Sequence, residues 1–322
     1  PRMPRSPACL LTVLLLAVCV PHGGVAAQEA GSATAASLAL GPNVSARATG
    51  SLPFFYDLYT FRGDKGRTEI IASFAVPAER LREEREGSGV RYRFDVTLVL
   101  SDTARHSVSR TDDSVYVQVP RRLAGKHLLH THVELDAPPS STTLQRVLMY
   151  DATTPGVGQL YGAPFTIPDY RGGSLMLSDV ALGLPGATRG WERGDVTLAL
   201  LPTSQFPQSS FDVYYEVYNL PAGHDYTTDI SVERIDEDAD ETRPVHARFT
   251  GRSEADSADA LPELRRVEAS LDEGRYLLTV TVTDRTTGET ARRTRLFQVR
   301  GWGPGITLVP ALPSAREVRG GA

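Results

Sequence analysis

Apolar and polar residues alternate with a period of two along most of this chain. The clearest alternation lies within Leu271–Val299, which reads LDEGRYLLTVTVTDRTTGETARRTRLFQV. Such alternation is typical of a strand with one face in a core and the other in solvent. A turn around Gly288 separates a strand at Tyr276–Thr283 from a last strand that contains Leu296 and Phe297. We therefore expect an antiparallel hairpin in this stretch.

The first half of the chain contains about seven short segments of this kind, separated by turn residues at the spacing of a β-sandwich. The segments are Phe54–Phe61, Thr68–Val76, Val90–Leu100, Val115–Val119, Lys126–Leu135, Leu144–Tyr150 and Ala163–Ile167. The charged stretch Leu81–Gly89 is expected to form a short helical turn or a loop. The glycine-containing stretch Gly156–Gly162 is expected to be a loop between strands, because it lacks the spacing of a dinucleotide-binding fingerprint.

The second half repeats the pattern after a predicted linker at 169–173. Its segments are Ser174–Val180, Val196–Leu201, Phe211–Leu220, Asp229–Ile235, Val245–Thr250, Leu264–Leu271 and the hairpin described above. No segment has a sustained helical period, so little helix is expected. We predict an all-β fold with two consecutive immunoglobulin-like or fibronectin-like antiparallel β-sandwich domains, at 51–168 and 174–300, and a flexible tail at 301–322.

The N-terminal residues have the pattern of a secretory signal peptide. Arg2 and Arg5 precede the apolar run Ala8–Val20, which is too short to span a bilayer as a mature helix. Small residues before Gln28 fit a cleavage site, so we expect a signal peptide at 1–27 and a flexible leader at 28–50. Alternatively, a weak lipobox before Cys19 would attach a lipid there. Apart from these routes, we expect no contact with a membrane.

The composition of the chain indicates its source and disfavours one class of partner. The net charge of −5 does not favour nucleic-acid binding, which needs a concentrated positive surface. Lysine occurs only at Lys65 and Lys126, and we interpret the excess of arginine as the coding bias of a GC-rich bacterial genome. Both cysteines, Cys9 and Cys19, lie in the predicted signal peptide, so the mature chain is expected to contain no disulfide.

Three stretches carry a family resemblance. They are FDVYYEVYNL (Phe211–Leu220), LMLSDV (Leu175–Val180) and the ending LDEGRYLLTVTVTDRTTGE. Residues 174–299 resemble the β-rich region of exported bacterial GWxTD-domain proteins and, more generally, bacterial immunoglobulin-like modules. The GWxTD motif itself is absent, because Gly190–Gly194 departs from it after the second residue. The resemblance implies a fold and an envelope location, and no activity.

One cluster has residue types that bind metals. His130, His132 and Glu134 alternate along one predicted strand, so their side chains share a face. Two imidazoles and a carboxylate are ligands that zinc or iron accepts. The alternative is an ordinary polar face, with Leu129 and Val133 on the buried side. A metal-dependent enzyme at these residues is therefore one functional hypothesis.

Aromatic residues form two further candidate sites. Phe54 and Tyr56 belong to an aromatic strand, and Tyr214 and Tyr218 share one face of another strand with Glu216. If these faces are uncovered, they are platforms for a sugar or a protein. Burial between the two domains is the alternative, and a contact through these two strands would explain both patches at once.

The sequence contains no convergent catalytic set, so the leading hypothesis is a non-enzymatic interaction or structural module. We expect an exported bacterial envelope protein, periplasmic or secreted, with a protein partner and no cofactor. Partners could bind by sheet-edge addition or at the aromatic faces. A carbohydrate-binding or ligand-binding module is the alternative, with polysaccharide as the possible partner.

Overall fold

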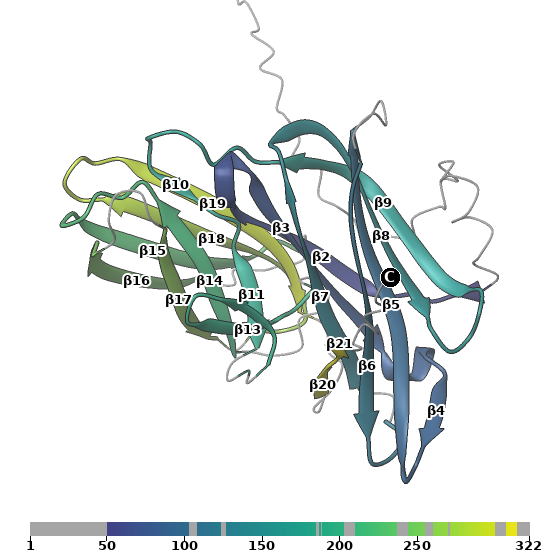
Figure 1. Cartoon of the computed structure of the whole chain (residues 1–322). Helices are drawn as coiled ribbons and strands as arrows, with labels where there is room; N and C mark the ends of the chain where they lie inside the picture. The colour runs from purple at the N-terminus through teal and green to yellow at the C-terminus, as the bar shows by residue number, and fades with distance from the viewer. Residues whose placement is uncertain are drawn as a thin grey trace, which may run out of the picture. The chain divides into compact units, whose positions relative to one another are not determined.

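The computed structural model describes residues 50–102, 108–123, 127–184, 187, 189–202, 210–236, 244–254, 260–269, 271–299 and 307–313. These described residues belong to one compact unit. Regular structure in them is almost entirely strand (Figure 1), since the helical elements η1 (Asp64–Gly66) and η2 (Ala78–Arg80) are single 3-10 turns. In this part of the chain, no helix has the length and apolar composition needed to cross a membrane.

The first part of the chain forms two facing sheets. Its strands are β1 (Gly50–Ser51), β2 (Phe55–Arg62), β3 (Thr68–Pro77), β4 (Glu83–Glu86), β5 (Gly89–Asp102), β6 (Val108–Val119), β7 (His127–Ala137), β8 (Ser140–Asp151) and β9 (Val157–Ile167). A seven-stranded sheet has the order β1-β9-β8-β5-β6-β21, with β4 paired to β5. A four-stranded sheet has the order β2-β3-β7-β20. Two strands from the end of the chain, β20 (Thr307–Pro310) and β21 (Leu312–Pro313), complete these sheets.

The second part forms another pair. Its strands are β10 (Met176–Leu177), β11 (Ala181–Leu184), β12 (Trp191–Arg193), β13 (Val196–Leu200), β14 (Ser210–Tyr218), β15 (Asp225–Arg234), β16 (Val245–Arg252), β17 (Leu261–Glu268), β18 (Gly274–Asp284) and β19 (Thr290–Val299). A six-stranded sheet contains β10-β14-β11-β13-β12, and β17 pairs with the other edge of β14. A four-stranded sheet has the order β16-β15-β18-β19.

Each pair of sheets encloses its own apolar core. The first core contains Phe74 of β3 and Phe94 of β5, both fully buried. The second contains Val213 of β14 and Val280 of β18, also fully buried. The cores form because alternate side chains on each strand point to the same face, so facing sheets can remove both apolar faces from water.

The predicted all-β, sandwich-like class is confirmed. Two assignments from the sequence are wrong. The stretch Leu81–Gly89 contains strand β4, which pairs with the start of β5. The stretch Gly156–Gly162 lies largely in strand β9, where Gly158 makes room for the ring of Tyr150. Strands β11 and β12 were not anticipated.

Other expectations are left open. The immunoglobulin-like resemblance and the limits of two domains stay predictions. The predicted signal peptide, the leader before Gly50 and the lipobox at Cys19 lie outside the described residues. Within the tail that was expected to be flexible, Thr307–Pro310 pairs in parallel with His127–His130, and Leu312 pairs with Tyr116 of β6.

Candidate functional site at the contact between the two pairs of sheets

A third apolar cluster joins the two pairs of sheets. Its fully or almost fully buried members are Tyr59, Phe61, Ile71, Ala181, Trp191, Leu198, Leu200 and Tyr214. The first three come from β2 and β3, and the others come from β11 to β14. The rings of Phe61 and Trp191 stack with their centroids 5.0 Å apart, and Tyr214 meets Trp191 edge-on at 5.3 Å. The central strands of this contact are thus buried on both faces.

The free edge of β2 is covered by side chains from the second pair. At this edge, backbone groups of Leu58, Thr60 and Arg62 point away from β3 and bond to residues of the second pair. The carbonyl oxygen of Leu58 accepts two hydrogen bonds from Arg295 of β19, both 3.1 Å. The N–H of Thr60 donates to Asp179 at 3.0 Å, and its carbonyl accepts the N–H of Asp179 at 2.9 Å.

The edge of β2 is covered at Arg62 as well. The N–H of Arg62 donates to the hydroxyl of Tyr218 at 2.8 Å, and its carbonyl accepts from Arg193 at 3.0 Å. An unpaired sheet edge is a template for pairing with another chain. Here that template is used within the molecule, which fixes the register of the contact.

Half-buried Arg193 of β12 is the centre of a charged group. Its guanidinium forms ion pairs with Glu216 and Glu69, and lies 5.0 Å from the ring centroid of Phe61. Glu216 is only 3% exposed and also accepts hydrogen bonds from the hydroxyls of Tyr214, at 2.8 Å, and Tyr218, at 2.6 Å. The carboxylate is therefore fully paired in a place where an unpaired charge would be costly.

Protonation in this group follows from burial and pairing. Burial opposes the charge of Arg193, but the hydrogen bonds and charges of Glu216 and Glu69 outweigh it and raise the pKa of Arg193. Burial raises the pKa of Glu69, and the neighbouring Arg193 partly offsets that effect. The hydroxyls of Tyr214 and Tyr218 have raised pKa values, first through burial and then through the charge of Glu216. Both tyrosines thus stay protonated donors.

A second charged group lies beside the first. Arg293 pairs with Asp179 at 3.1 Å and donates to the hydroxyl of Tyr170 at 2.9 Å. Tyr170 donates to the carbonyl of Thr60 at 3.1 Å, and burial raises its pKa to about 12. Arg295 pairs with Asp57 and lies 4.4 Å from the ring centroid of Tyr59. Tyr170 belongs to the predicted linker, so that segment is part of the contact.

The predicted aromatic platforms are corrected by these observations. Tyr214 and Tyr218 share a face as expected, but both are fully buried, so neither ring is available as an open surface. Phe54 is 4% exposed and lies in the first core, and partly buried Tyr56 packs against that core. The alternative from the sequence was burial between two domains, and in the structure the ring of Tyr214 packs against that of Phe61, with their centroids 5.7 Å apart.

The histidine hypothesis is not carried by the geometry. His130 is 5% exposed, and burial lowers its pKa to about 4, as it does for His132. The Nε2 atom of His132 lies 3.6 Å from a carboxylate oxygen of Glu134. Among the described residues, no three His, Cys, Asp or Glu side chains are grouped so that they could hold a metal ion. Metal binding at these residues stays a prediction.

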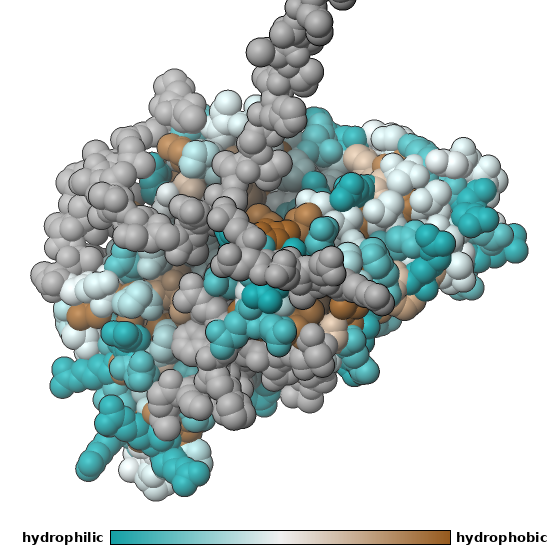
Figure 2. Space-filling view, turned by 180° about the vertical axis from the view of Figure 1, so that it is seen from behind, coloured by the Kyte–Doolittle hydropathy of each residue, from teal (hydrophilic) through white to brown (hydrophobic). Residues whose placement is uncertain are grey.

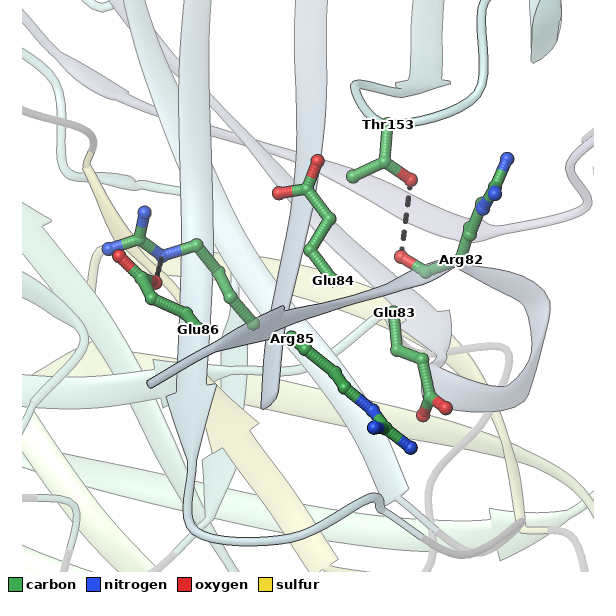
Figure 3. A pocket seen from close by; sticks show the side chains of 7 residues that line it. Arg82, Glu83, Glu84, Arg85, Glu86 and Thr153 are labelled. Carbon is green, nitrogen blue, oxygen red and sulfur yellow. Dashed lines mark hydrogen bonds and ion pairs between the residues drawn. The ribbon is translucent and has the colours of Figure 1, made fainter. Parts of the chain in front are cut away.

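A separate charged hollow lies beside β4. It has a volume of about 600 Å³ and is lined by Arg82, Glu83, Glu84, Arg85, Glu86, Arg91 and Thr153. Figure 3 shows the side chains of β4 projecting to both sides of the strand, with Thr153 hydrogen-bonded to the carbonyl of Arg82. Glu86 pairs with Arg91 at 2.5 Å. Three arginines and three glutamates line the hollow, so their formal charges balance and favour neither an anion nor a cation.

Sequence reasoning missed the residues that matter most at the contact, namely Arg193, Asp179 and Arg295. Arg193 and Asp179 lie in short segments without alternation. Arg295 belongs to the arginine-rich run Arg292–Arg295 of the last strand, which is typical of a solvent-exposed face. The one available indication was the run FDVYYEVYNL, which has aromatic residues on both faces and is therefore suited to a strand with two buried faces.

Comparisons with known proteins add no family. No family model and no curated protein matches the chain. Red sea bream transglutaminase is 12% identical with a TM-score of 0.22, and the match covers 76% of this chain and 31% of that one. A calcium-binding mutant of Bacteroides uniformis β-glucuronidase 2 is 9% identical with a TM-score of 0.25, over 77% and 28%. The chain thus spans about a third of these proteins or less, and likenesses this distant carry no argument.

Proposed function

We propose that this protein is an exported, non-enzymatic interaction or structural module of a bacterial envelope, in which the two pairs of sheets act as one rigid body. The observation that carries the proposal is the contact just described. Its buried aromatic rings and paired charges hold two sheet pairs together, as a scaffold with a fixed surface requires. The N-terminal apolar run supports export, and the coding bias supports a bacterial source.

The ionisable residues most deeply placed at the contact already have partners inside the molecule. Asp179 and Arg295 hold groups of β2, and the carboxylate of Glu216 accepts hydrogen bonds from Tyr214 and Tyr218 of its own strand. These interactions orient elements and leave no unpaired base aimed at a substrate in this group. Such a group can fix the position of one pair of sheets relative to the other, and that is the role the proposal assigns to it.

The test is in-cell cross-linking of the tagged mature protein in its native envelope, followed by identification of the captured proteins. The proposal expects one dominant envelope partner that the Arg193→Met variant captures less well, since that variant loosens the contact. The matched control is Arg110→Met, which removes an exposed arginine paired with Asp112 at 3.4 Å. Capture of no partner above background would contradict the proposal.

A further inference from the structure

The strand β16 is an edge strand of the sheet β16-β15-β18-β19 and contains no proline. All eight of its residues pair with β15, and no described strand lies on its other side. Figure 1 shows β16 at the margin of its sheet. Several other edges are interrupted or partly covered. Side chains cover β2, Pro164 lies in β9, Pro262 lies in β17, and β21 pairs with part of β6.

The register shows which backbone groups of β16 are open. Ser253 donates its N–H to the carbonyl of His224 at 2.8 Å, one step beyond the pair Asp225–Arg252. Hydrogen-bonded and non-hydrogen-bonded pairs alternate in an antiparallel ladder, so Arg252 belongs to a non-hydrogen-bonded pair. The N–H and C=O groups of the even-numbered residues from His246 to Arg252 therefore point away from β15.

The side chains of these same residues are basic or neutral. His246, Arg248, Thr250 and Arg252 are all exposed, and none is acidic. The side chains of Arg248 and Arg252 are 73% and 71% exposed. Arg248 pairs with Asp229 at 2.5 Å, and Arg252 lies 3.9 Å from Asp225. Exposed ion pairs of this kind contribute little, so both guanidinium groups can turn to a new carboxylate.

The opposite face of β16 is apolar. Val245 and Phe249 are half-buried and pack against the second core. The guanidinium of Arg265, on the edge strand β17 of the facing sheet, lies 5.0 Å from the ring centroid of Phe249. Its Nε atom is buried without a hydrogen-bond partner. A strand added to β16 would place its inward side chains beside Phe249.

Resting on the proposed function, we infer that β16 binds an extended segment of the partner protein by strand addition, and that this segment alternates acidic with apolar residues. Backbone hydrogen bonds to the even-numbered residues supply the pairing. Carboxylates opposite Arg248 and Arg252 supply charge complementarity, and apolar side chains cover Phe249.

The test measures binding of a capped, fluorescently labelled peptide that alternates valine and glutamate over the length of β16. The expected result is saturable binding to the full chain, and no binding of the matched peptide that alternates valine and lysine. The double substitution Arg248→Glu and Arg252→Glu should weaken binding by about tenfold or more, because it replaces attraction by repulsion.

A backbone variant separates strand addition from simple charge attraction. Thr250→Pro removes an N–H that points to the open edge and is not used by β15, so the fold should tolerate it. It should abolish binding, whereas Thr250→Val should keep it. Circular dichroism and a melting curve confirm that both variants fold.

Equal binding by Thr250→Pro and the wild type would overturn the inference, and so would no binding of the glutamate peptide to the wild type. The latter is the result expected if the arginines only protect the edge from pairing. With either of these two peptide-binding results, capture of an envelope partner in cells would mean that the inference fails and the proposed function stands. If no partner is captured, the proposed function fails.

Discussion

At the scale of single residues, the contact depends on charges that are buried and fully paired. A buried ion pair contributes little by itself, because desolvation offsets most of its attraction. Removal of one partner is different, since it leaves the other charge uncompensated. Glu216 illustrates the point, because Arg193, Tyr214 and Tyr218 together satisfy both of its carboxylate oxygens.

We expect Arg193→Met to lower the free energy of unfolding by about 3–5 kcal/mol, because it strands the carboxylate of Glu216 in an apolar contact. Arg110→Met, at an exposed ion pair, should change it by less than about 1 kcal/mol. Chemical denaturation of both variants measures the difference. A similar small effect for both would show that the Arg193 group does not stabilise the contact.

The buried histidines should make stability depend on pH. Burial lowers the pKa of His130 and of His132 from 6.5 to about 4, so only the unfolded chain takes up these protons between those values. Stability is then fully present above pH 6.5 and falls as the pH drops towards 4, by up to about 3 kcal/mol for His130.

Denaturation curves at several pH values between 6.5 and 4 measure this slope. The double variant His130→Leu and His132→Leu should flatten it. Glu134 remains in that variant as an internal control, because burial raises the pKa of its carboxyl and it titrates in the opposite sense. An unchanged slope in the double variant would assign the pH dependence to other groups.

At the scale of elements, close approach decides where glycine is required. In β9, a Cβ atom on Gly158 would lie 2.2 Å from a ring carbon of Tyr150 on the neighbouring strand. The ring lies over the glycine, so the sequence GVGQLYG is compatible with a strand. In the sequence alone, the same glycines are typical of a loop, which explains the wrong assignment.

Gly158→Ala should therefore destabilise the protein by about 1–3 kcal/mol through overpacking. Gly162→Ala is the matched control on the same face of β9, where the nearest atom to an added Cβ is 3.3 Å away, so its cost should be smaller. Thermal melting of the two variants compares them. Equal melting temperatures would mean that the ring of Tyr150 moves aside at no cost.

At the scale of the whole molecule, three buried clusters couple all four sheets. The surface differs from one region to another. On the face seen in Figure 2, hydrophobic residues gather near the middle, while hydrophilic residues predominate towards the right-hand end. The apolar side chains that join the two pairs of sheets are buried, whereas some large hydrophobic residues, such as Leu264 and Leu296, are exposed elsewhere.

We expect the described unit to unfold in a single calorimetric transition, because the contact ties the two cores together. Trp191→Ala should cost about 3–5 kcal/mol and split the transition into two, one for each pair of sheets. Val117→Ala, in the first core only, should lower the melting temperature without a split. Two transitions in the unaltered protein would instead support two independent domains.

The sequence by itself determined the all-β class and the position of most strands. Alternation is a local property, since the side chains of neighbouring residues on any strand point to opposite faces. Tyr276, Leu278, Val280 and Val282 could therefore be assigned to a buried face without knowledge of what covers it, and they lie in the second core.

Only the tertiary structure decided which side chains and strand edges are covered by distant parts of the chain. Tyr214 reads as an exposed platform until Phe61, far from it in the sequence, and Trp191 of the same sheet close over its ring. The edge of β2 reads as open until Asp179, Arg193 and Arg295 reach it. The contacts made by β2 join segments separated by more than a hundred residues, and nothing in the local pattern of a strand specifies its distant neighbours.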